Sequence, residues 1–146
     1  MNQTHDTVRK MLAYGLAAIL LASAPLFSVA GANNDRIMQT GGGISYVSGG
    51  VGADSIARLD ALAGDFNLKL VFALESGNYV SDVKVTIADA AGRILIDATA
   101  RGPWFLAKLA AGNYQIVATF ADRPVTRRIS IGSAKSSTID FRWPAE

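Results

Sequence analysis

The sequence contains no cysteine among its 146 residues, and its single histidine is His5. Without cysteine, disulfide bonds, thiolate metal sites and a cysteine nucleophile are excluded. His5 lies in an N-terminal stretch that we expect to be removed. The rest of the chain then lacks the usual general base near neutral pH, any Ser-His-Asp triad and any histidine metal ligand. A hydrolase built on this chain would have to use carboxylates alone, and we predict that the protein is not an enzyme.

An excess of one charge is also missing. The chain has 14 lysines and arginines against 12 aspartates and glutamates, for a net charge of +2. Beyond residue 32 the one adjacent basic pair is Arg127 and Arg128, and neighbouring side chains of a strand point to opposite faces. A nucleic-acid-binding protein would show a basic stripe. We therefore expect no nucleic-acid partner.

The acidic residues and glycines show no pattern of a metal or cofactor site. The acidic residues at predicted turns are Glu75, Asp82, Asp89 and Asp97. They lack the spacing of an EF-hand, and aspartate at a turn usually hydrogen-bonds to the local backbone. The glycines at 41–43 are not followed by the lysine of a phosphate-binding loop. We predict no metal and no cofactor.

Residues 1–32 are typical of a signal peptide. Arg9-Lys10 ends a polar region, and residues 11–24 are continuously apolar or small. Small residues then offer cleavage after Ala30 or Ala32, of which Ala32 is preferred because a polar segment follows it. The prediction is export to the periplasm or the exterior. An uncleaved leader would instead anchor the chain, because the apolar stretch is nearly long enough to span a membrane.

Glycine is concentrated just after the leader. Residues 33–50 hold five of the 14 glycines, which predicts a flexible connector. Ile44 and Tyr46 in this segment could form a short edge strand.

One amphipathic helix is predicted, at residues 53–64. Its apolar residues recur at helical spacing at Ile56, Leu59 and Leu62. Gly52 or Asp54 can cap its start, and the apolar stripe is narrow. This pattern favours a helix that covers a face or an open end of the domain over a helix that docks on a partner.

The remaining chain alternates apolar and polar residues with a period of two, which predicts seven or eight strands. The clearest strand is 66–74, with every second residue apolar. Asp89-Ala90-Ala91-Gly92 predicts a tight turn in which the aspartate caps the backbone and Gly92 takes a positive φ. A parallel α/β sheet would need helices between its strands. We therefore predict a mostly β, antiparallel Greek-key sandwich.

The stretch 102–120, GPWFLAKLAAGNYQIVATF, alternates on both sides of a Gly-Asn pair. This pattern predicts a β-hairpin with one buried face. The residues that we expect on that face are Trp104, Leu106, Tyr114 and Ile116.

This hairpin and the preceding strands resemble carboxypeptidase regulatory-like domains. The shared motif, valines and isoleucines in alternation, then D-x-x-G, then L-x-x-G-x-Y, runs from Val83 to Val117. The glycine pair, helix and FNLKLVF strand before it look like small exported proteobacterial proteins of that group, so the resemblance covers about Gly49 to Ile131. It implies a prealbumin-like sandwich over 51–146. Its motifs are core and turn residues and imply no catalytic site.

Phe105 has the opposite parity to Trp104, so we expect it to be exposed or packed under the helix. It is our first candidate for contact with a partner, followed by Tyr79 and Tyr46. The predicted function is an exported, non-enzymatic accessory or protein-binding module of the bacterial cell envelope, with another envelope protein as partner. The alternative is a carbohydrate-binding module of starch-binding-like fold. That alternative needs exposed, coplanar aromatic side chains, and the parity of Trp104 and Trp143 favours the core instead.

Overall fold

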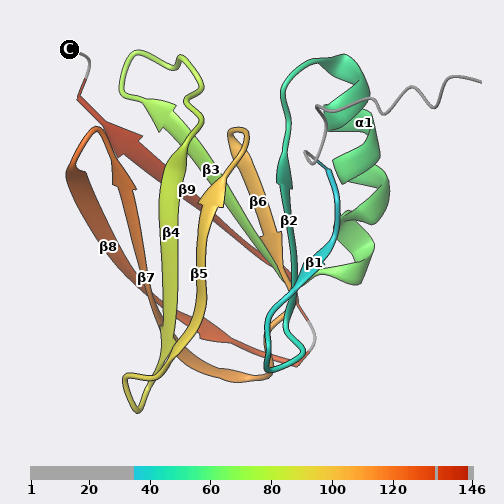
Figure 1. Ribbon diagram of the computed structural model, residues 1–146, viewed down its shortest axis with the longest axis vertical. Helices are drawn as coiled ribbons and strands as arrows, with labels where there is room; N and C mark the ends of the chain where they lie inside the picture. Colours follow the sequence, from blue (N-terminus) through green and yellow to red (C-terminus); the bar gives the residue numbers. More distant parts are fainter. Residues whose placement is uncertain (1–34, 134, 145–146) are drawn as a thin grey trace, which may run out of the picture.

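A computed structural model describes residues 35–133 and 135–144; the signal peptide predicted for residues 1–32 lies outside them. The described chain is mostly β, with one short helix (Figure 1). Its elements are β1 (Met38–Gln39), β2 (Ser45–Gly49), α1 (Ala53–Leu62), the 3₁₀ turn η1 (Ala63–Asp65), β3 (Leu68–Leu74), β4 (Val83–Asp89), β5 (Ile94–Ala100), β6 (Trp104–Ala107), β7 (Gly112–Phe120), β8 (Arg123–Ile131) and β9 (Ser137–Trp143).

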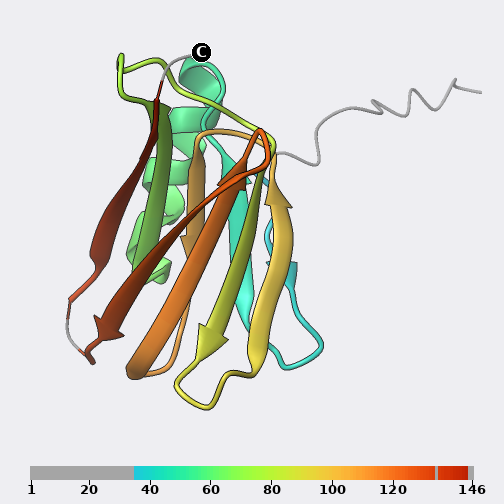
Figure 2. The same cartoon turned by 90° about the vertical axis from the view of Figure 1, so that its left-hand side faces the viewer.

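The strands form two facing sheets, as the sandwich prediction requires. Sheet A has the order β1-β2-β6-β3-β9, and sheet B has the order β5-β4-β7-β8. Helix α1 lies on the outer face of sheet A, so sheet A is the middle of three layers (Figures 1 and 2). This arrangement covers sheet A on both faces, whereas the outer face of sheet B is open.

The main core lies between the sheets and is built from alternating residues of their strands. In β3 and β4 the inward side chains are those expected from the period of two: Leu68, Leu70, Phe72, Val83, Val85 and Ile87. All of these are at most 1% exposed. Phe72, Phe141 and Trp143 pack together with ring centres 5.8 to 6.3 Å apart. Apolar burial on this scale is the main stabilising contribution to such a domain.

One strand pair departs from the antiparallel prediction. β9 runs parallel to β3, from Leu68 opposite Ser137 to Leu74 opposite Trp143. The chain crosses from β8 in sheet B to sheet A before β9 begins, and this crossing sets the direction in which β9 runs. Alternation fixes which residues face the core but carries no information on strand direction, and the wholly antiparallel prediction is wrong for this pair.

The predicted hairpin over 102–120 is also wrong. β6 belongs to sheet A and β7 to sheet B, so the segment between them crosses from one sheet to the other. The side chain of Asn67 holds this crossing by accepting from the Leu109 N–H at 2.9 Å and donating to the Leu109 carbonyl at 2.6 Å. The Tyr114 hydroxyl donates to the Ala110 carbonyl at 2.6 Å. These bonds replace the turn that a hairpin would have.

The orientation of β6 is the reverse of the prediction. Phe105 is fully buried between the sheets, whereas Trp104 and Leu106 point to the helix side of sheet A. At β6 both faces of sheet A are covered by apolar groups, so the residues that point to either face are apolar. Alternation alone therefore cannot tell which residues of β6 face the main core. Phe105 is therefore excluded as a surface contact.

The flexible connector predicted for residues 33–50 is wrong over its second half. β2 pairs with β6 along four residues and with the short β1 on its other side. Val47 is fully buried under the helix. One glycine of this segment, Gly49, therefore belongs to a strand, where it allows close packing, rather than to a linker.

Helix α1 is confirmed, although it ends two residues earlier than predicted and continues as η1. Leu59 is fully buried against Val47, Phe66 and Leu106, and Leu62 packs against the same cluster. Gly52 is the N-cap, and no side chain caps the helix. The helix covers a face of the sandwich, as its narrow stripe favoured. Within the described residues no helix is both long and apolar enough to cross a membrane.

Candidate functional site

The part of the chain that the structure describes contains no histidine and no cysteine. Among those residues no group of three or more acidic side chains gathers where a metal ion could bind. Every buried side-chain nitrogen or oxygen in this part has a hydrogen-bond partner. The buried residues that the structure describes thus pack the core, and the candidate site described below lies on the surface.

An apolar groove lies at the end of the sandwich where α1 begins, and we name it the end groove. It has a volume of about 340 Å³ and is lined by Gly50, Val51, Gly52, Tyr79, Val80, Ser81 and Pro103. Tyr79 is 64% exposed and Val51 is 60% exposed. An apolar groove between two large exposed side chains is the kind of surface that another protein covers.

Val51 is held out of the core by its two neighbours. Gly50 has a φ of +96° and Gly52 has a φ of +85°, conformations that favour glycine. A side chain on Gly50 would also press on Trp104, since its Cβ would lie 3.1 Å from that ring. The chain leaves β2, turns at these glycines and enters α1, so Val51 occupies the exposed corner of the connection.

Tyr79 sits on an equally well-defined segment between β3 and β4. The Gly77 N–H donates to the Leu74 carbonyl at 2.9 Å and the Leu74 N–H donates to the Asn78 carbonyl at 2.8 Å, closing a tight turn. The Val80 N–H then donates to the Phe72 carbonyl at 3.2 Å. Backbone bonds on both sides of Tyr79 thus fix the base of its exposed ring.

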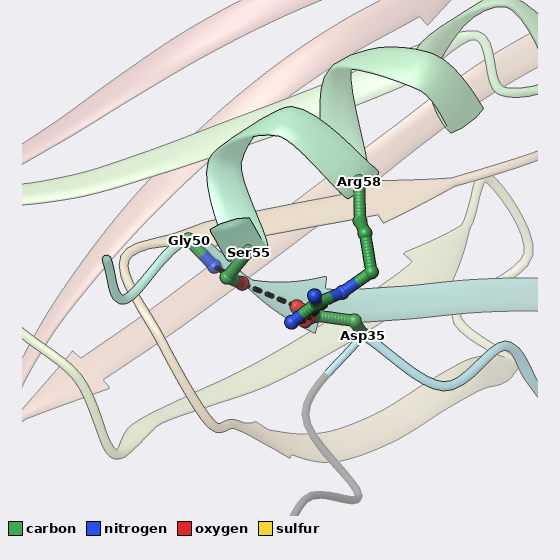
Figure 3. A network of polar contacts seen from close by, with 4 residues as sticks. All are labelled: Asp35, Gly50, Ser55 and Arg58. Atoms are coloured by element: carbon green, nitrogen blue, oxygen red, sulfur yellow. Dashed lines mark hydrogen bonds and ion pairs between the residues drawn. The ribbon is translucent and has the colours of Figure 1, made fainter. Parts of the chain in front are cut away.

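A polar network of Asp35, Ser55 and Arg58 holds Gly50, a residue that lines the end groove (Figure 3). The Ser55 hydroxyl accepts a hydrogen bond from the Gly50 N–H at 2.7 Å and donates to Oδ1 of Asp35. Arg58 donates to Oδ2 of Asp35 through Nε at 2.9 Å and through Nη2 at 2.5 Å. The Asp35 side chain is only 5% exposed, while that of Arg58 is 58% exposed. A buried carboxylate with this many donors is well satisfied.

The network ties three segments together. Asp35 precedes β1 and donates its own N–H to the Ser48 carbonyl in β2 at 2.8 Å. Ser55 and Arg58 belong to the first half of α1. Because Gly50 is both a partner of Ser55 and a wall of the end groove, the network sets the position of that wall.

The carboxyl group with a shifted pKa, that of Asp89, lies away from the end groove. The Arg93 backbone N–H donates to Asp89, and together with the Arg93 side chain and the Ala91 N–H it lowers the pKa of the Asp89 carboxyl from its ordinary value. Asp89 lies in the turn between β4 and β5, at the opposite end of the sandwich from the end groove (Figure 1). Gly92 in this turn has a φ of +86°, as its sequence predicts. The perturbed carboxyl stabilises a turn and is not part of the site.

Of the three predicted contact residues, one lies at the end groove. Tyr79 is there and is exposed; Tyr46 is half-buried and stacks on Phe105 with ring centres 5.4 Å apart. Phe105 is buried. The sequence reasoning did not identify Val51, although its position between two glycines was a signal that it would be forced outward.

Comparison of the sequence with protein family models gave no match, and a search of curated proteins found none similar to it.

Proposed function

We propose that the protein is an exported, non-enzymatic accessory module of the bacterial cell envelope that binds another protein through the end groove. The observation that carries the proposal is that Tyr79 and Val51, both largely exposed, line the same apolar groove. Tyrosine is enriched at binding hot spots because it combines a large apolar area with a polar tip.

The fold that we propose in detail is a carboxypeptidase regulatory-like, prealbumin-like sandwich with Greek-key connections. The observation that supports it is the connection order: β3 to β9 pass repeatedly between the two sheets, with β4-β5 and β7-β8 as the consecutive pairs within sheet B. Domains of this kind resemble accessory modules more than enzymes, which agrees with the proposed role.

A carbohydrate-binding role has less support. Sugar rings stack on open, flat aromatic faces, and among the described residues Tyr79 is the one aromatic side chain that is largely exposed. Trp143 is 1% exposed. Trp104 is half-buried, and the Lys69 ammonium lies 3.5 Å from the centre of its ring. A platform of two coplanar aromatics is thus not offered by this part of the chain.

The proposal is tested by placing a photocrosslinking amino acid at Tyr79 in cells that export the protein. We expect one discrete crosslinked protein, and we expect the additional substitution Val51→Asp to abolish it, because a charge in the apolar groove is costly to desolvate. The matched control places the same crosslinker at Thr126, an exposed residue of β8. The proposal fails if the two positions yield the same products, if Val51→Asp changes nothing, or if no protein is crosslinked at Tyr79.

A further inference from the structure

The sandwich has four strand edges, and they are protected to different degrees. β1 and β9 are the edges of sheet A, and β5 and β8 are the edges of sheet B. β1 has only two residues. β8 carries three arginines and a proline, and β9 carries Asp140 and Arg142. Short length, charge and proline are the usual devices that keep an edge from pairing with another strand.

β5 lacks these devices. Its seven residues, ILIDATA, include one charged side chain, Asp97, and no proline, lysine or arginine. One side of its backbone pairs with β4, and the other side has no strand partner among the described residues. Ile94 at its start is 63% exposed. A seven-residue edge of this composition can accept an additional strand.

A groove runs beside this edge, between β5 of sheet B and β1 and β2 of sheet A, which we name the seam groove. Its volume is about 350 Å³, and it is lined by Arg36, Met38, Tyr46, Ser48, Asp97, Ala98, Thr99 and Arg101. Figure 2 shows the β5 edge next to β1 and β2. The floor is apolar through Met38, Tyr46 and Ala98, and the Ser48 hydroxyl accepts from the Arg101 N–H at 3.0 Å across the two sheets.

The charged side chains of the seam groove indicate what kind of segment can bind there. Arg36 and Arg101 are exposed, and neither forms an ion pair with a described residue. They stand against a single carboxylate, Asp97, so the groove is cationic. Two unpaired guanidinium groups beside an open strand edge favour an extended segment that carries carboxylates, because arginine binds carboxylate in a bidentate geometry.

We infer that β5 and the seam groove form a second binding surface, which takes up an extended acidic peptide of a partner protein as an added strand of sheet B. Main-chain hydrogen bonds to the β5 edge supply the affinity, and contacts from Arg36 and Arg101 to acidic side chains supply the selectivity. This surface includes none of the residues of the end groove and does not depend on the proposed function.

The experiment titrates the ¹⁵N-labelled protein with a capped seven-residue peptide that alternates valine with glutamate, and with its counterpart in which lysine replaces glutamate. We expect the glutamate peptide to bind about tenfold more tightly than the lysine peptide. The two exposed arginines attract its carboxylates, whereas they repel the ammonium groups of the lysine peptide. Amide hydrogen exchange in residues 94–100 should slow when it binds. The double substitution Arg36→Glu and Arg101→Glu should invert the order of the two affinities.

The matched control is Arg127→Glu with Arg128→Glu, which makes the same charge change on the β8 edge and should leave the order unchanged. Tyr79→Ser should also leave peptide binding unchanged, which separates this surface from the end groove. The inference is overturned if neither peptide binds or if the two peptides bind equally. It is also overturned if the preference for the glutamate peptide is lost in the β8 control variant but kept in the variant of Arg36 and Arg101. It is likewise overturned if the free protein sediments as a dimer and the amides of residues 94–100 are already protected from exchange without peptide.

Discussion

A methyl group on the Cα of Gly49 would overlap the carboxylate of Asp35. The same Cβ would lie 2.9 Å from the Ser55 hydroxyl, so the last residue of β2 leaves room for the polar network by having no side chain. A Cβ on Gly102 would in turn overlap the carbonyl oxygen of Gly49, so Gly102 too must lack a side chain here. Close approach of this kind is a common reason for glycine inside a strand.

Gly49→Ala should therefore lower the free energy of unfolding by about 1–3 kcal/mol, since either Asp35 or the backbone must move. Urea denaturation measures the loss. Gly132→Ala is the matched control, because a Cβ there meets nothing within 4 Å and the φ of Gly132 is not in the left-handed region. An equal effect of the two substitutions would contradict the crowding described at Gly49.

Phe105 and Tyr79 should respond to substitution in opposite ways. Phe105→Ala leaves a cavity between the sheets and should cost about 3–5 kcal/mol of unfolding free energy. Tyr79→Ala removes an exposed ring and should change stability by less than about 0.5 kcal/mol. Thermal and urea unfolding of both variants check this. A marginal loss for Phe105→Ala would contradict the burial of that ring between the sheets.

Within the polar network, Ser55 should matter more than Arg58. Ser55→Ala leaves the Gly50 N–H and one Asp35 oxygen without their partner in a buried place, a loss of about 1–3 kcal/mol. Arg58→Ala removes a largely exposed ion pair and should cost about 0.2–1 kcal/mol. Urea unfolding of the two single variants and the double variant gives their coupling. The expected ranking is lost if Arg58→Ala proves the more damaging change.

Asp89 should make the stability of the turn between β4 and β5 depend on pH. Its pKa is lowered in the folded chain, chiefly by the Arg93 backbone N–H, so its contribution is fully present above the unfolded pKa of about 3.9. The contribution is lost as the pH falls through the folded value. Asp89→Asn should therefore be less stable than the natural chain at pH 7, and the difference should shrink below about pH 4.

Denaturation curves at pH 7 and pH 3 measure this difference, with Asp140→Asn on β9 as the control at an exposed position. An NMR titration of the Asp89 carboxyl gives its pKa directly. A stability difference that stays constant between the two pH values would show that the ionised carboxylate is not what stabilises the turn.

The sequence was sufficient to predict the features that depend on local periodicity and turn chemistry. The inward residues of β3 and β4, the helix and the Asp89-Gly92 turn all follow from side-chain spacing within one segment. The sheet to which each strand belongs does not follow from the spacing within one segment. Adjacency in the sequence predicts one hairpin for β6 and β7, and no local pattern indicates the four-residue crossing that Asn67 holds between them.

The candidate site was predicted only in part for the same reason. Tyr79 lies in a polar turn, where an aromatic residue is conspicuous. Asp35 and Ser55 are 20 residues apart, and their bond exists only once β2 and α1 have packed. The orientation of β6 could not be predicted without knowing that the helix covers sheet A, because this cover is why the residues on both faces of that strand are apolar.

The parallel pairing of β3 with β9 also sets the order in which the molecule can be completed. On one side, β3 (68–74) pairs only with residues 137–143, which follow all the other described strands in the sequence. During synthesis sheet A stays incomplete beside β3, and Phe72 lacks its contacts with Phe141 and Trp143, until residues 137–143 have been made. The core therefore closes only after β9 has been made, and a chain without residues 137–143 would leave β3 as an open edge.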